Sequence, residues 1–326
     1  MQYVRFGRSS LKVSRLGLGA MGFGDASWRR WVLDATASRP ILARAVERGI
    51  TFVDTCDFYS DGASERILGE VLWDLVPRDA IVLATKAGNP MGKGPNDRGF
   101  SRKHLFSAVD ASLKRLRTEY IDLYQTHVWD AATDLDEMVE AFTDLRRAGK
   151  VLYVGATTMP AWTFATCVER ARATGQTAFA SMQCEYNLCH REAERELIPY
   201  CGAAGLACTP FSPFARGFLC ADRREPGNAT ARHESDDYTL KHYHRPADYA
   251  VQEAVDAVAR GRGVSRAQVA LAWVLRQPCV TAPLFGATRV EQVDEAVAAL
   301  ELDLEDAEVA RLEAAYAPRP TRAGGH

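Results

Sequence analysis

Short apolar runs rich in β-branched residues alternate with longer segments of helical periodicity between about residues 16 and 300. This alternation predicts a parallel sheet, because a helix must carry the chain back across the sheet before the next parallel strand can begin. No Pro-, Gly- or Ser-rich linker interrupts the pattern. The sequence therefore predicts a single α/β domain over residues 1–326.

The runs yield eight candidate strands with helical segments between them. The strands are expected at residues 15–18, 51–54, 80–85, 121–125, 152–155, 181–184, 206–209 and 280–284. The helices are expected at residues 40–48, 64–74, 101–116, 134–148, 160–173, 192–203, 247–260, 265–275 and 289–298. Eight units of about 35 residues fit a (β/α)8 TIM barrel. A doubly wound open sheet is the alternative, because the number of strands does not show whether the sheet closes.

Several helix ends carry recognisable capping residues. Ser101, Asp134 and Ser265 precede helical segments as N-caps, since a short polar side chain can accept a hydrogen bond from the first turn. Pro40 is expected in the first turn of its helix, where a missing N–H costs nothing. Gly149 follows a periodic stretch, as a C-terminal cap does. These signals support the expected helix boundaries.

Two segments stand outside the repeat. Residues 6–13 form a turn between two short strands, which predicts an N-terminal β-hairpin. Residues 212–245 form a long segment with little periodicity after the seventh expected strand. Long loops in compact domains are usually functional, and the loops after barrel strands carry the active sites. The expected fold is therefore a barrel with an N-terminal β-hairpin and long βα active-site loops.

Charge and cysteine usage exclude several classes of function. Forty Lys plus Arg against 42 Asp plus Glu give a net charge of -2, so neither nucleic acid nor a membrane is expected as a partner. No signal peptide and no apolar run near ~18 residues is present, which predicts a cytoplasmic protein. The eight cysteines contain no C-x-x-C pair, so reduced thiols are expected and no metal site. The oligomeric state is left open.

Residues 17–22 match the pattern G-x-G-x-x-G. In a dinucleotide-binding fold this pattern opens a helix whose N-terminus holds a pyrophosphate. Residues 23–30 show no helical face, however, and the unit follows a hairpin signal. Glycines that allow close backbone approach at a strand end are the interpretation that the context favours.

Polar side chains follow three consecutive expected strands. Asp54 ends the second strand, Lys86 ends the third, and His127 follows the fourth, with Tyr59 shortly after Asp54. These strand ends share one rim of a barrel, so the side chains are expected to meet. Lys86 would lower the pKa of Tyr59, Asp54 would pair with Lys86, and His127 would orient a carbonyl oxygen. Such a group suits proton donation to an oxygen that gains negative charge.

At these residues the chain resembles the aldo-keto reductases, (β/α)8 barrels that reduce aldehydes and ketones with NAD(P)H. The resemblance is carried by Gly19-Ala20-Met21-Gly22, Asp54-Thr55 with Tyr59, Ser64-Glu65 with Leu68-Gly69, Leu113 to His127, and Phe211-Ser212-Pro213. It implies that Tyr59 is the general acid, that Lys86 and Asp54 tune it, and that His127 orients the carbonyl.

The resemblance also implies which residues hold NADPH. Residues expected near the nicotinamide and its ribose are Met21, Gly22, Thr157, Gln183 and Phe211. Residues expected along the pyrophosphate are Ser212, Phe214 and Gly217. Residues expected at the adenosine phosphate are Gly286, Thr288, Arg289, Gln292 and Glu295. Arg289 and Thr288 offer a cation and a hydroxyl for a 2′-phosphate, which favours NADPH over NADH. For Phe211, packing in the core is the alternative.

The expected function is the reduction of a small-molecule aldehyde or ketone, with a keto-sugar as one candidate because residues 88–99 are polar and Gly-rich. The alternative is a cofactor-binding subunit that senses redox state with little turnover. Four aromatic residues of the expected loops either line a substrate pocket or fill the core: Trp28, Trp31, Trp129 and Tyr243.

Overall fold

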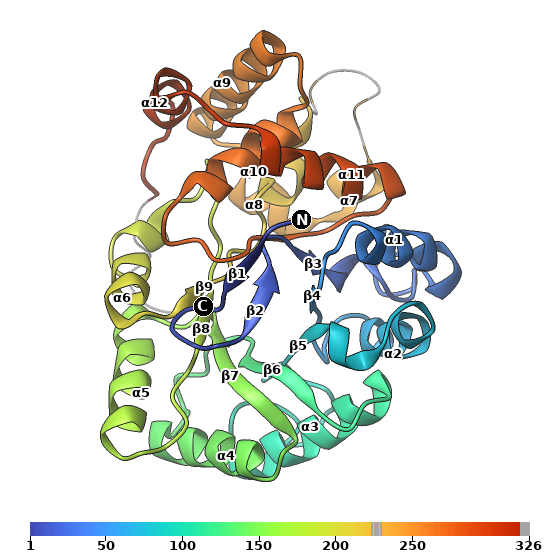
Figure 1. Ribbon diagram of the computed structural model, residues 1–326, viewed down its shortest axis with the longest axis vertical. Helices are drawn as coiled ribbons and strands as arrows, with labels where there is room; N and C mark the ends of the chain where they lie inside the picture. Colours follow the sequence, from blue (N-terminus) through green and yellow to red (C-terminus); the bar gives the residue numbers. More distant parts are fainter. Residues whose placement is uncertain (223, 225–227, 229, 320–326) are drawn as a thin grey trace.

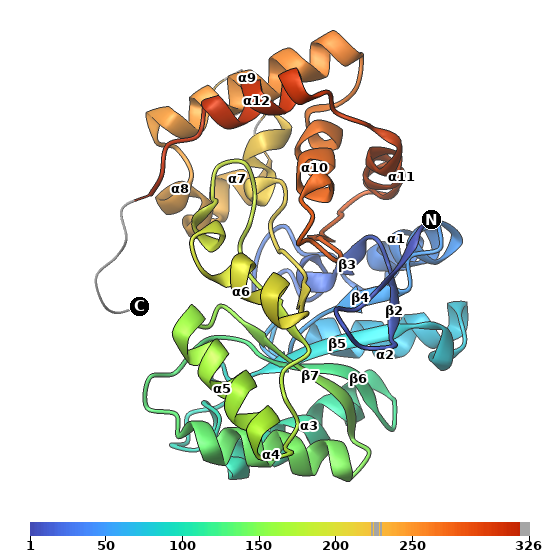
Figure 2. The ribbon, with the colours of Figure 1, turned by 60° about the vertical axis from the view of Figure 1, so that its left-hand side comes forward.

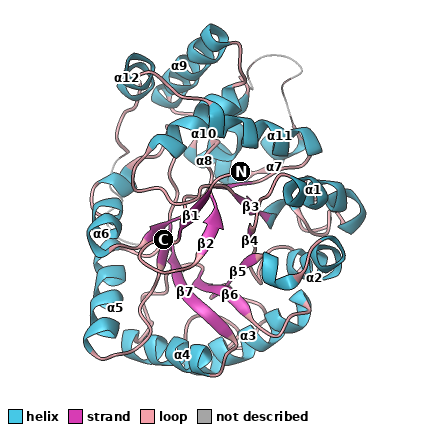
Figure 3. Cartoon of the chain, in the orientation of Figure 1, coloured by secondary structure: helices cyan, strands magenta, loops and turns pink. Residues whose placement is uncertain are grey.

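The computed structural model describes residues 1–222, 224, 228 and 230–319. Within them, eight parallel strands are hydrogen-bonded in the order β10-β3-β4-β5-β6-β7-β8-β9. Figures 1 and 3 show these strands inside a ring of helices. The strands are β3 (Gly17–Gly19), β4 (Phe52–Asp54), β5 (Val82–Ala87), β6 (Ile121–Thr126), β7 (Val151–Thr157), β8 (Ser181–Gln183), β9 (Ala207–Cys208) and β10 (Leu284–Phe285).

The sheet closes between β9 and β10, which stand at the two ends of the strand order given above. The Thr281 N–H donates to the carbonyl oxygen of Cys208 at 2.7 Å, and the Leu284 N–H donates to that of Pro210 at 2.7 Å. Parallel bridges at Cys208–Val280 and Phe211–Leu284 accompany these bonds. From β3 to β9 neighbouring strands are consecutive in the sequence, and the last strand, β10, pairs with the first, β3, so the order never reverses as it does in a doubly wound sheet. The predicted (β/α)8 barrel is confirmed.

The helices alternate with the strands as expected. The larger ones are α1 (Ala35–Glu47), α2 (Ala63–Leu75), α3 (Arg102–Leu116), α4 (Leu135–Arg147), α5 (Ala161–Ala173), α6 (Leu197–Ala204), α9 (Pro246–Arg262), α10 (Arg266–Arg276), α11 (Val290–Ala298) and α12 (Asp306–Ala314). The three predicted N-caps are confirmed: Ser101, Asp134 and Ser265 each accept a hydrogen bond from an N–H of the first turn. Short 3-10 helices complete the chain: η1 (Ala20–Gly22), η2 (Arg78–Ala80), η3 (Glu192–Glu194), η4 (Ala215–Cys220) and η5 (Ala299–Glu301).

Two expectations about helices were wrong. Helix α1 begins at Ala35, because Asp34 caps it by accepting the Ala37 N–H at 2.9 Å. Pro40 therefore lies inside this helix and not in its first turn. The segment 212–245 is also more ordered than expected, since it contains η4 and two short helices, α7 (Ala231–Ser235) and α8 (Asp237–His242). Helix α12 lies beyond the last expected helix and runs alongside α9, as Figure 2 shows.

The predicted N-terminal hairpin closes the amino end of the barrel. Strands β1 (Tyr3–Arg5) and β2 (Lys12–Ser14) pair antiparallel. Phe6 and Val13 join one apolar cluster with the strand residues Phe52, Leu123 and Leu284. The rings of Phe6 and Phe52 meet edge to face at 6.0 Å between centroids. Apolar side chains thus fill the amino end, and polar groups are left to the carboxyl end.

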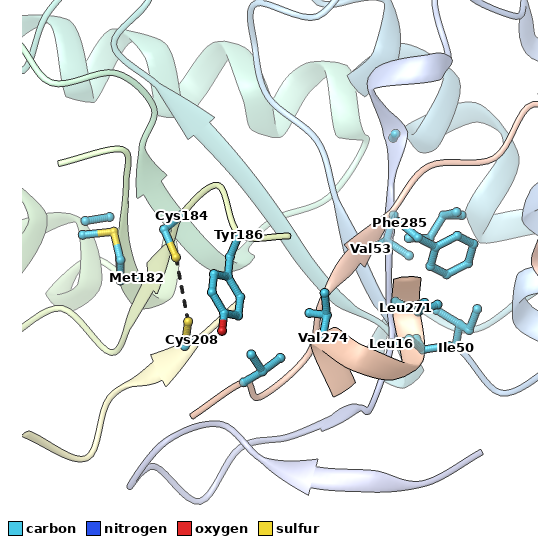
Figure 4. Packing of buried hydrophobic residues seen from close by; sticks show 14 of the residues in the cluster. Leu16, Ile50, Val53, Met182, Cys184, Tyr186, Cys208, Leu271, Val274 and Phe285 are labelled. Atoms are coloured by element: carbon cyan, nitrogen blue, oxygen red, sulfur yellow. Dashed lines mark hydrogen bonds between the residues drawn. The ribbon is translucent and has the colours of Figure 1, made fainter. Parts of the chain in front are cut away.

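A second, larger cluster lies between the sheet and its helices. Figure 4 shows Leu16 and Val53 from the strand side packed near Leu271 and Val274 of α10. On the other side of the view, the sulfurs of Cys184 and Cys208 lie 3.9 Å apart. Strands buried on both faces hold the strand ends in fixed positions. In the described part of the chain, every helix is too short or too polar to cross a bilayer.

Candidate active site

The structure brings Asp54, Tyr59, Lys86 and His127 together at the carboxyl end of the barrel. Asp54 is the last residue of β4, Lys86 lies near the end of β5, and His127 follows β6. The parallel register pairs Asp54 with Gly19 and with Ala84, which sets the strand ends at one level. Tyr59 lies in the loop that leads from β4 to α2. The four residues expected to act together therefore do share one rim.

Asp54 and Lys86 form a buried ion pair. The Lys86 ammonium donates to Oδ1 of Asp54 at 2.5 Å and to the carbonyl oxygen of Thr55 at 2.7 Å. Lys86 is 0% exposed and Asp54 is 3% exposed. The side-chain amides of Gln125 and Gln183 donate to Oδ2 of Asp54 at 3.1 and 3.0 Å. Both carboxylate oxygens are thereby held, which fixes the ammonium beneath the rim.

The charge of this pair sets the protonation states of its neighbours. Burial is the largest single effect and would lower the pKa of Lys86, but the charge and hydrogen bond of Asp54, together with interactions with Tyr59 and Cys56, outweigh it. The pKa of Lys86 is therefore raised, and the side chain stays an ammonium. Burial raises the pKa of Tyr59 above its ordinary value, and the Lys86 charge only partly offsets this rise. The expectation of a lowered Tyr59 pKa was therefore wrong in its net direction, because desolvation is the larger effect.

The phenol and the imidazole face each other above the ammonium. The Lys86 nitrogen lies 5.4 Å from the ring centroid of Tyr59, and the rings of Tyr59 and His127 meet edge to face at 5.7 Å. Burial and the nearby Lys86 charge lower the pKa of His127 to about 3. His127 is thus neutral near pH 7, with one ring nitrogen free to donate.

The sequence did not identify two polar residues of this site. Gln125 lies inside the buried strand β6 and supports Asp54. Asn89, three residues after Lys86, has its side-chain nitrogen 2.7 Å from Nδ1 of His127. For Gln125 the signal was available, because a fully buried polar side chain in a strand core needs a partner. For Asn89 no local signal existed.

The two segments expected to hold opposite ends of the cofactor lie close together. Met21 and Gly22 belong to η1, directly after β3. A Cβ on Gly22 would lie 3.6 Å from the carbonyl oxygen of Ala287, and Gly286 lies similarly close to Gly19. These are ordinary contacts, so close backbone approach does not explain Gly22. The chain after Gly22 forms no long helix until α1. The Rossmann interpretation of residues 17–22, which the sequence context already disfavoured, does not apply, and it is Gly17 that is tightly packed, since a Cβ there would lie 2.4 Å from the side chain of Leu284 and 2.8 Å from that of Phe52.

Polar groups suited to a carboxamide line the next part of the rim. The Thr157 hydroxyl, at the end of β7, is buried with no hydrogen-bond partner among the described residues. A buried hydroxyl of this kind fits a ligand that completes its hydrogen bonding. Gln183 ends β8 and donates to Asp54. Phe211 is half-buried, lies outside the hydrophobic clusters of the described residues, and forms isolated parallel bridges with Glu185 and Leu284.

The segment from Ser212 to Gly217 has an unusual backbone. Ser212, Ala215 and Arg216 have φ angles of 57°, 48° and 58°, and Gly217 has 92°. The Gly217 N–H donates to the carbonyl oxygen of Phe214 at 2.9 Å. Left-handed residues in succession turn backbone N–H groups toward one concave side, which suits an anion such as a pyrophosphate. Strained backbone of this kind is typical of functional sites.

The expected adenosine-phosphate segment lies at the N-terminus of α11. The side-chain oxygen of Gln292 accepts from the N–H groups of Thr288 and Arg289 at 2.7 and 3.2 Å. These N–H groups stand at a helix N-terminus, a position whose dipole suits an anion such as a phosphate. Glu295 lies one turn further along the same helix. The residues present therefore fit a nicotinamide dinucleotide.

The long segment 212–245 folds back onto the loop after β3. Arg216 pairs with the buried Asp236 at 2.6 Å, and Arg232 pairs with it at 3.3 Å. Arg29, from the loop after β3, lies 3.7 Å from the same carboxylate. These ion pairs connect two loops that were expected to shape the site, although the sequence did not indicate the connection.

Of the four aromatic residues named from the sequence, Trp28 lies at the site. Its ring centroid is 6.4 Å from that of Tyr59 and 6.3 Å from that of Phe58. Trp31 and Tyr243 are buried instead, at 7% and 1% exposure. Trp129 packs partly against the core. Of these four aromatic side chains, the indole of Trp28 is therefore the one that lies beside the phenol of Tyr59.

A closed (β/α)8 barrel with an acid, an amine, a phenol and an imidazole on one rim defines a class of oxidoreductases that act on carbonyl groups. The model of the Aldo/keto reductase family matches residues 15–317. The chain belongs to the aldo-keto reductases, enzymes that use nicotinamide cofactors in carbonyl reduction.

Similar proteins span the whole chain. Versiconal hemiacetal acetate reductase of Aspergillus parasiticus is 38% identical and covers 99% of each chain. An aldo-keto reductase of Metarhizium robertsii is 38% identical, with 100% of this chain and 93% of its own length covered. A Saccharomyces cerevisiae protein named provisionally as an aryl-alcohol dehydrogenase is 36% identical, with 99% of each chain covered.

Proposed function

We propose that this enzyme reduces aldehydes or ketones with NADPH and that Tyr59 protonates the carbonyl oxygen. The observation that carries the proposal is the buried ammonium of Lys86, paired with Asp54 and 5.4 Å from the Tyr59 ring. A buried positive charge stabilises a phenolate far better than an exposed one does, because water does not screen it. A phenol in this position can lose its proton to a stronger base and remain in place as an anion.

The residues divide the work by charge. When bound, reduced nicotinamide supplies the hydride. The raised pKa of Tyr59 keeps the phenol protonated in the resting enzyme, so a proton is present when the substrate oxygen gains negative charge. Lys86 then stabilises the phenolate that remains, and Asp54 holds Lys86 in position. Neutral His127 donates a hydrogen bond to the carbonyl and orients it.

Replacing the phenol tests the assignment. We expect Tyr59→Phe to reduce kcat for carbonyl reduction by about 10²- to 10⁴-fold, since the acid is removed and the ring is kept. NADPH binding should be unchanged in a fluorescence titration. Tyr3→Phe makes the same chemical change on an exposed tyrosine at the other end of the barrel and should have no effect. Equal turnover of Tyr59→Phe and the unmodified enzyme would remove Tyr59 from the mechanism.

We propose that Arg289 makes the enzyme prefer NADPH, because this cationic residue is the N-cap of α11 and directly follows Thr288. Charged hydrogen bonds to a phosphate contribute about 1.5–3 kcal/mol. Arg289→Ala should therefore weaken NADPH binding about tenfold or more and leave NADH binding nearly unchanged in calorimetric titrations. Arg260→Ala, on the exposed face of α9, is the matched control. An equal loss for both cofactors would contradict a role in recognising the 2′-phosphate.

For the substrate, we propose an aromatic aldehyde as the first compound to test. The Trp28 ring stands beside Tyr59, and a relative carries the name aryl-alcohol dehydrogenase. The polar loop 88–99 supports the keto-sugar as the second candidate. Initial rates of NADPH consumption with benzaldehydes and with keto-sugars distinguish the two, because Trp28→Ala should raise KM for the aromatic compounds alone. The redox-sensing alternative is not favoured, since the similar proteins carry the names of reductases and dehydrogenases.

A further inference from the structure

The loop between β5 and α3 places one amide against the ring of His127. The side-chain nitrogen of Asn89 lies 2.7 Å from Nδ1 of His127. Both residues are half-buried, so the contact lies at the edge of the open site. Asn89 has no role in the mechanism proposed above, and the family resemblance implies none for it.

The chemistry of the two groups decides which ring nitrogen carries the proton. A neutral imidazole has one N–H, and the other nitrogen can only accept a hydrogen bond. An amide nitrogen only donates. Nδ1 of His127 must therefore accept the bond from Asn89, which leaves the ring proton on Nε2. A proton on Nε2 is what a carbonyl oxygen in the site requires.

We propose that Asn89 is a positioning residue that donates to Nδ1 of His127, keeps the ring proton on Nε2, and so turns a hydrogen-bond donor toward the substrate. The hydrogen bond and the position of the ring proton concern the protein alone. The role toward the substrate rests on the proposed carbonyl reduction.

The backbone around Asn89 holds the amide in place. The His127 N–H donates to the carbonyl oxygen of Ala87 at 2.9 Å, which ties the residue after β6 to the end of β5. Gly88 follows with a φ of 122°, and a Cβ there would lie 2.5 Å from the ring of Phe100. The Gly99 N–H donates to the Gly88 carbonyl oxygen at 3.0 Å and closes the loop. The approach of Asn89 to His127 is therefore built into the loop.

Other neighbours of His127 act on its charge rather than on its tautomer. Lys86 disfavours a positive charge on the ring. Tyr59 meets the ring edge to face. Since neither contact selects between the two neutral tautomers by itself, the amide of Asn89 is the group that selects.

The test is ¹⁵N NMR of the full-length protein labelled at histidine, at pH 8. The chain has seven histidines, and His127→Gln identifies the signals of His127. We expect the unmodified protein to carry the proton on Nε2. Asn89→Asp replaces the donor with an acceptor, so Nδ1 should become protonated. Asn96→Asp adds the same charge at an exposed position of the loop and should leave the tautomer unchanged.

Kinetics test the part that concerns the substrate. Asn89→Asp and Asn89→Leu should lower kcat/KM for an aldehyde by about 10- to 100-fold, since a misplaced donor loses orientation. NADPH affinity and the thermal midpoint of unfolding should match those of Asn96→Asp.

A proton on Nδ1 in the unmodified protein, or no change in Asn89→Asp, overturns the inference whatever the activity. A changed tautomer with unchanged turnover overturns the substrate-orienting part. Loss of activity in Tyr59→Phe is independent of both results, so failure of the proposed function is recognised separately.

Discussion

Asp57 is a buried acid two residues before Tyr59. It is 0% exposed, and neither carboxyl oxygen has a side-chain hydrogen-bond partner among the described residues. Burial raises the pKa of Asp57 well above its ordinary value, and the negative charge of Glu65 adds to the rise. Arg115, the backbone N–H of Phe58 and Lys86 oppose it. The carboxyl therefore stays protonated in the folded protein at pH values where the unfolded chain has lost the proton.

This difference predicts how stability depends on pH. Because the folded-state pKa of Asp57 is raised, its stabilising effect is complete below the unfolded value near 4 and is lost as pH rises toward the folded value. Asp57→Asn removes the titration. Relative to the unmodified protein, the variant should gain up to about 1.4 kcal/mol of unfolding free energy per pH unit above pH 4, measured by urea denaturation at pH 4, 6 and 8.

The exposed Asp61 supplies the control, since Asp61→Asn removes a carboxylate from the same loop without removing a buried one. A stability difference between Asp57→Asn and the unmodified protein that stays constant from pH 4 to pH 8 would show that Asp57 does not titrate in this way.

At the scale of single elements, α1 carries a proline in its interior. Pro40 is the sixth residue of the helix and is exposed. It has no N–H to donate to the carbonyl oxygen of Thr36, so the helix lacks one bond of its ladder. The strong N-cap at Asp34 and the apolar face of Ile41 and Leu42 keep the helix in place despite this loss.

Pro40→Ala should stabilise the fold. Alanine restores the helical hydrogen bond and favours the helix, which stabilises the folded state by up to about 3 kcal/mol. Loss of proline also makes the unfolded chain more flexible, which lowers the free energy of unfolding by about 0.4–1 kcal/mol. We expect a net gain of about 1–2 kcal/mol in chemical denaturation. Thr36→Ala, at an exposed position of the first turn, should stay within about 0.5 kcal/mol. A loss of stability in Pro40→Ala would mean that the proline ring contributes packing or chain stiffness worth more than the missing hydrogen bond.

For the whole molecule, the barrel separates stability from chemistry. The hairpin side chains Phe6 and Val13 fill the amino end, whereas Asp54 and Lys86 lie at the carboxyl end. Conserved packing at one end and adjustable loops at the other are the usual arrangement of this fold. Changes at the two ends are therefore expected to act independently.

Phe6→Ala tests this separation. Removing a buried ring should cost about 3–5 kcal/mol of unfolding free energy, because a cavity remains at the amino end. The kcat/KM for carbonyl reduction should stay within about twofold at temperatures where the variant is folded. Tyr3→Ala removes a ring that is 52% exposed and should change neither quantity appreciably. A parallel loss of kcat/KM and stability in Phe6→Ala would show that the two ends are coupled.

Local patterns were enough to predict the alternation of eight strands with helices, the hairpin, the caps at Ser101, Asp134 and Ser265, and the meeting of the four rim residues. Periodicity and capping depend on residues close together in the chain, and the carboxyl ends of consecutive parallel strands must share one rim. The start of α1 was missed, because Asp34 and Pro40 give competing local signals and the stronger cap prevailed.

Closure of the barrel, the support of Asp54 by Gln125 and Gln183, and the contact of Asn89 with His127 were decided by the tertiary structure alone. The raised pKa of Tyr59 was also decided by the tertiary structure. Each of these depends on distance and burial among residues far apart in the sequence, and desolvation follows from everything packed around a group rather than from its neighbours in the chain. The sequence determined which chemical groups reach the rim, and the packing of the closed barrel determined their protonation and their partners.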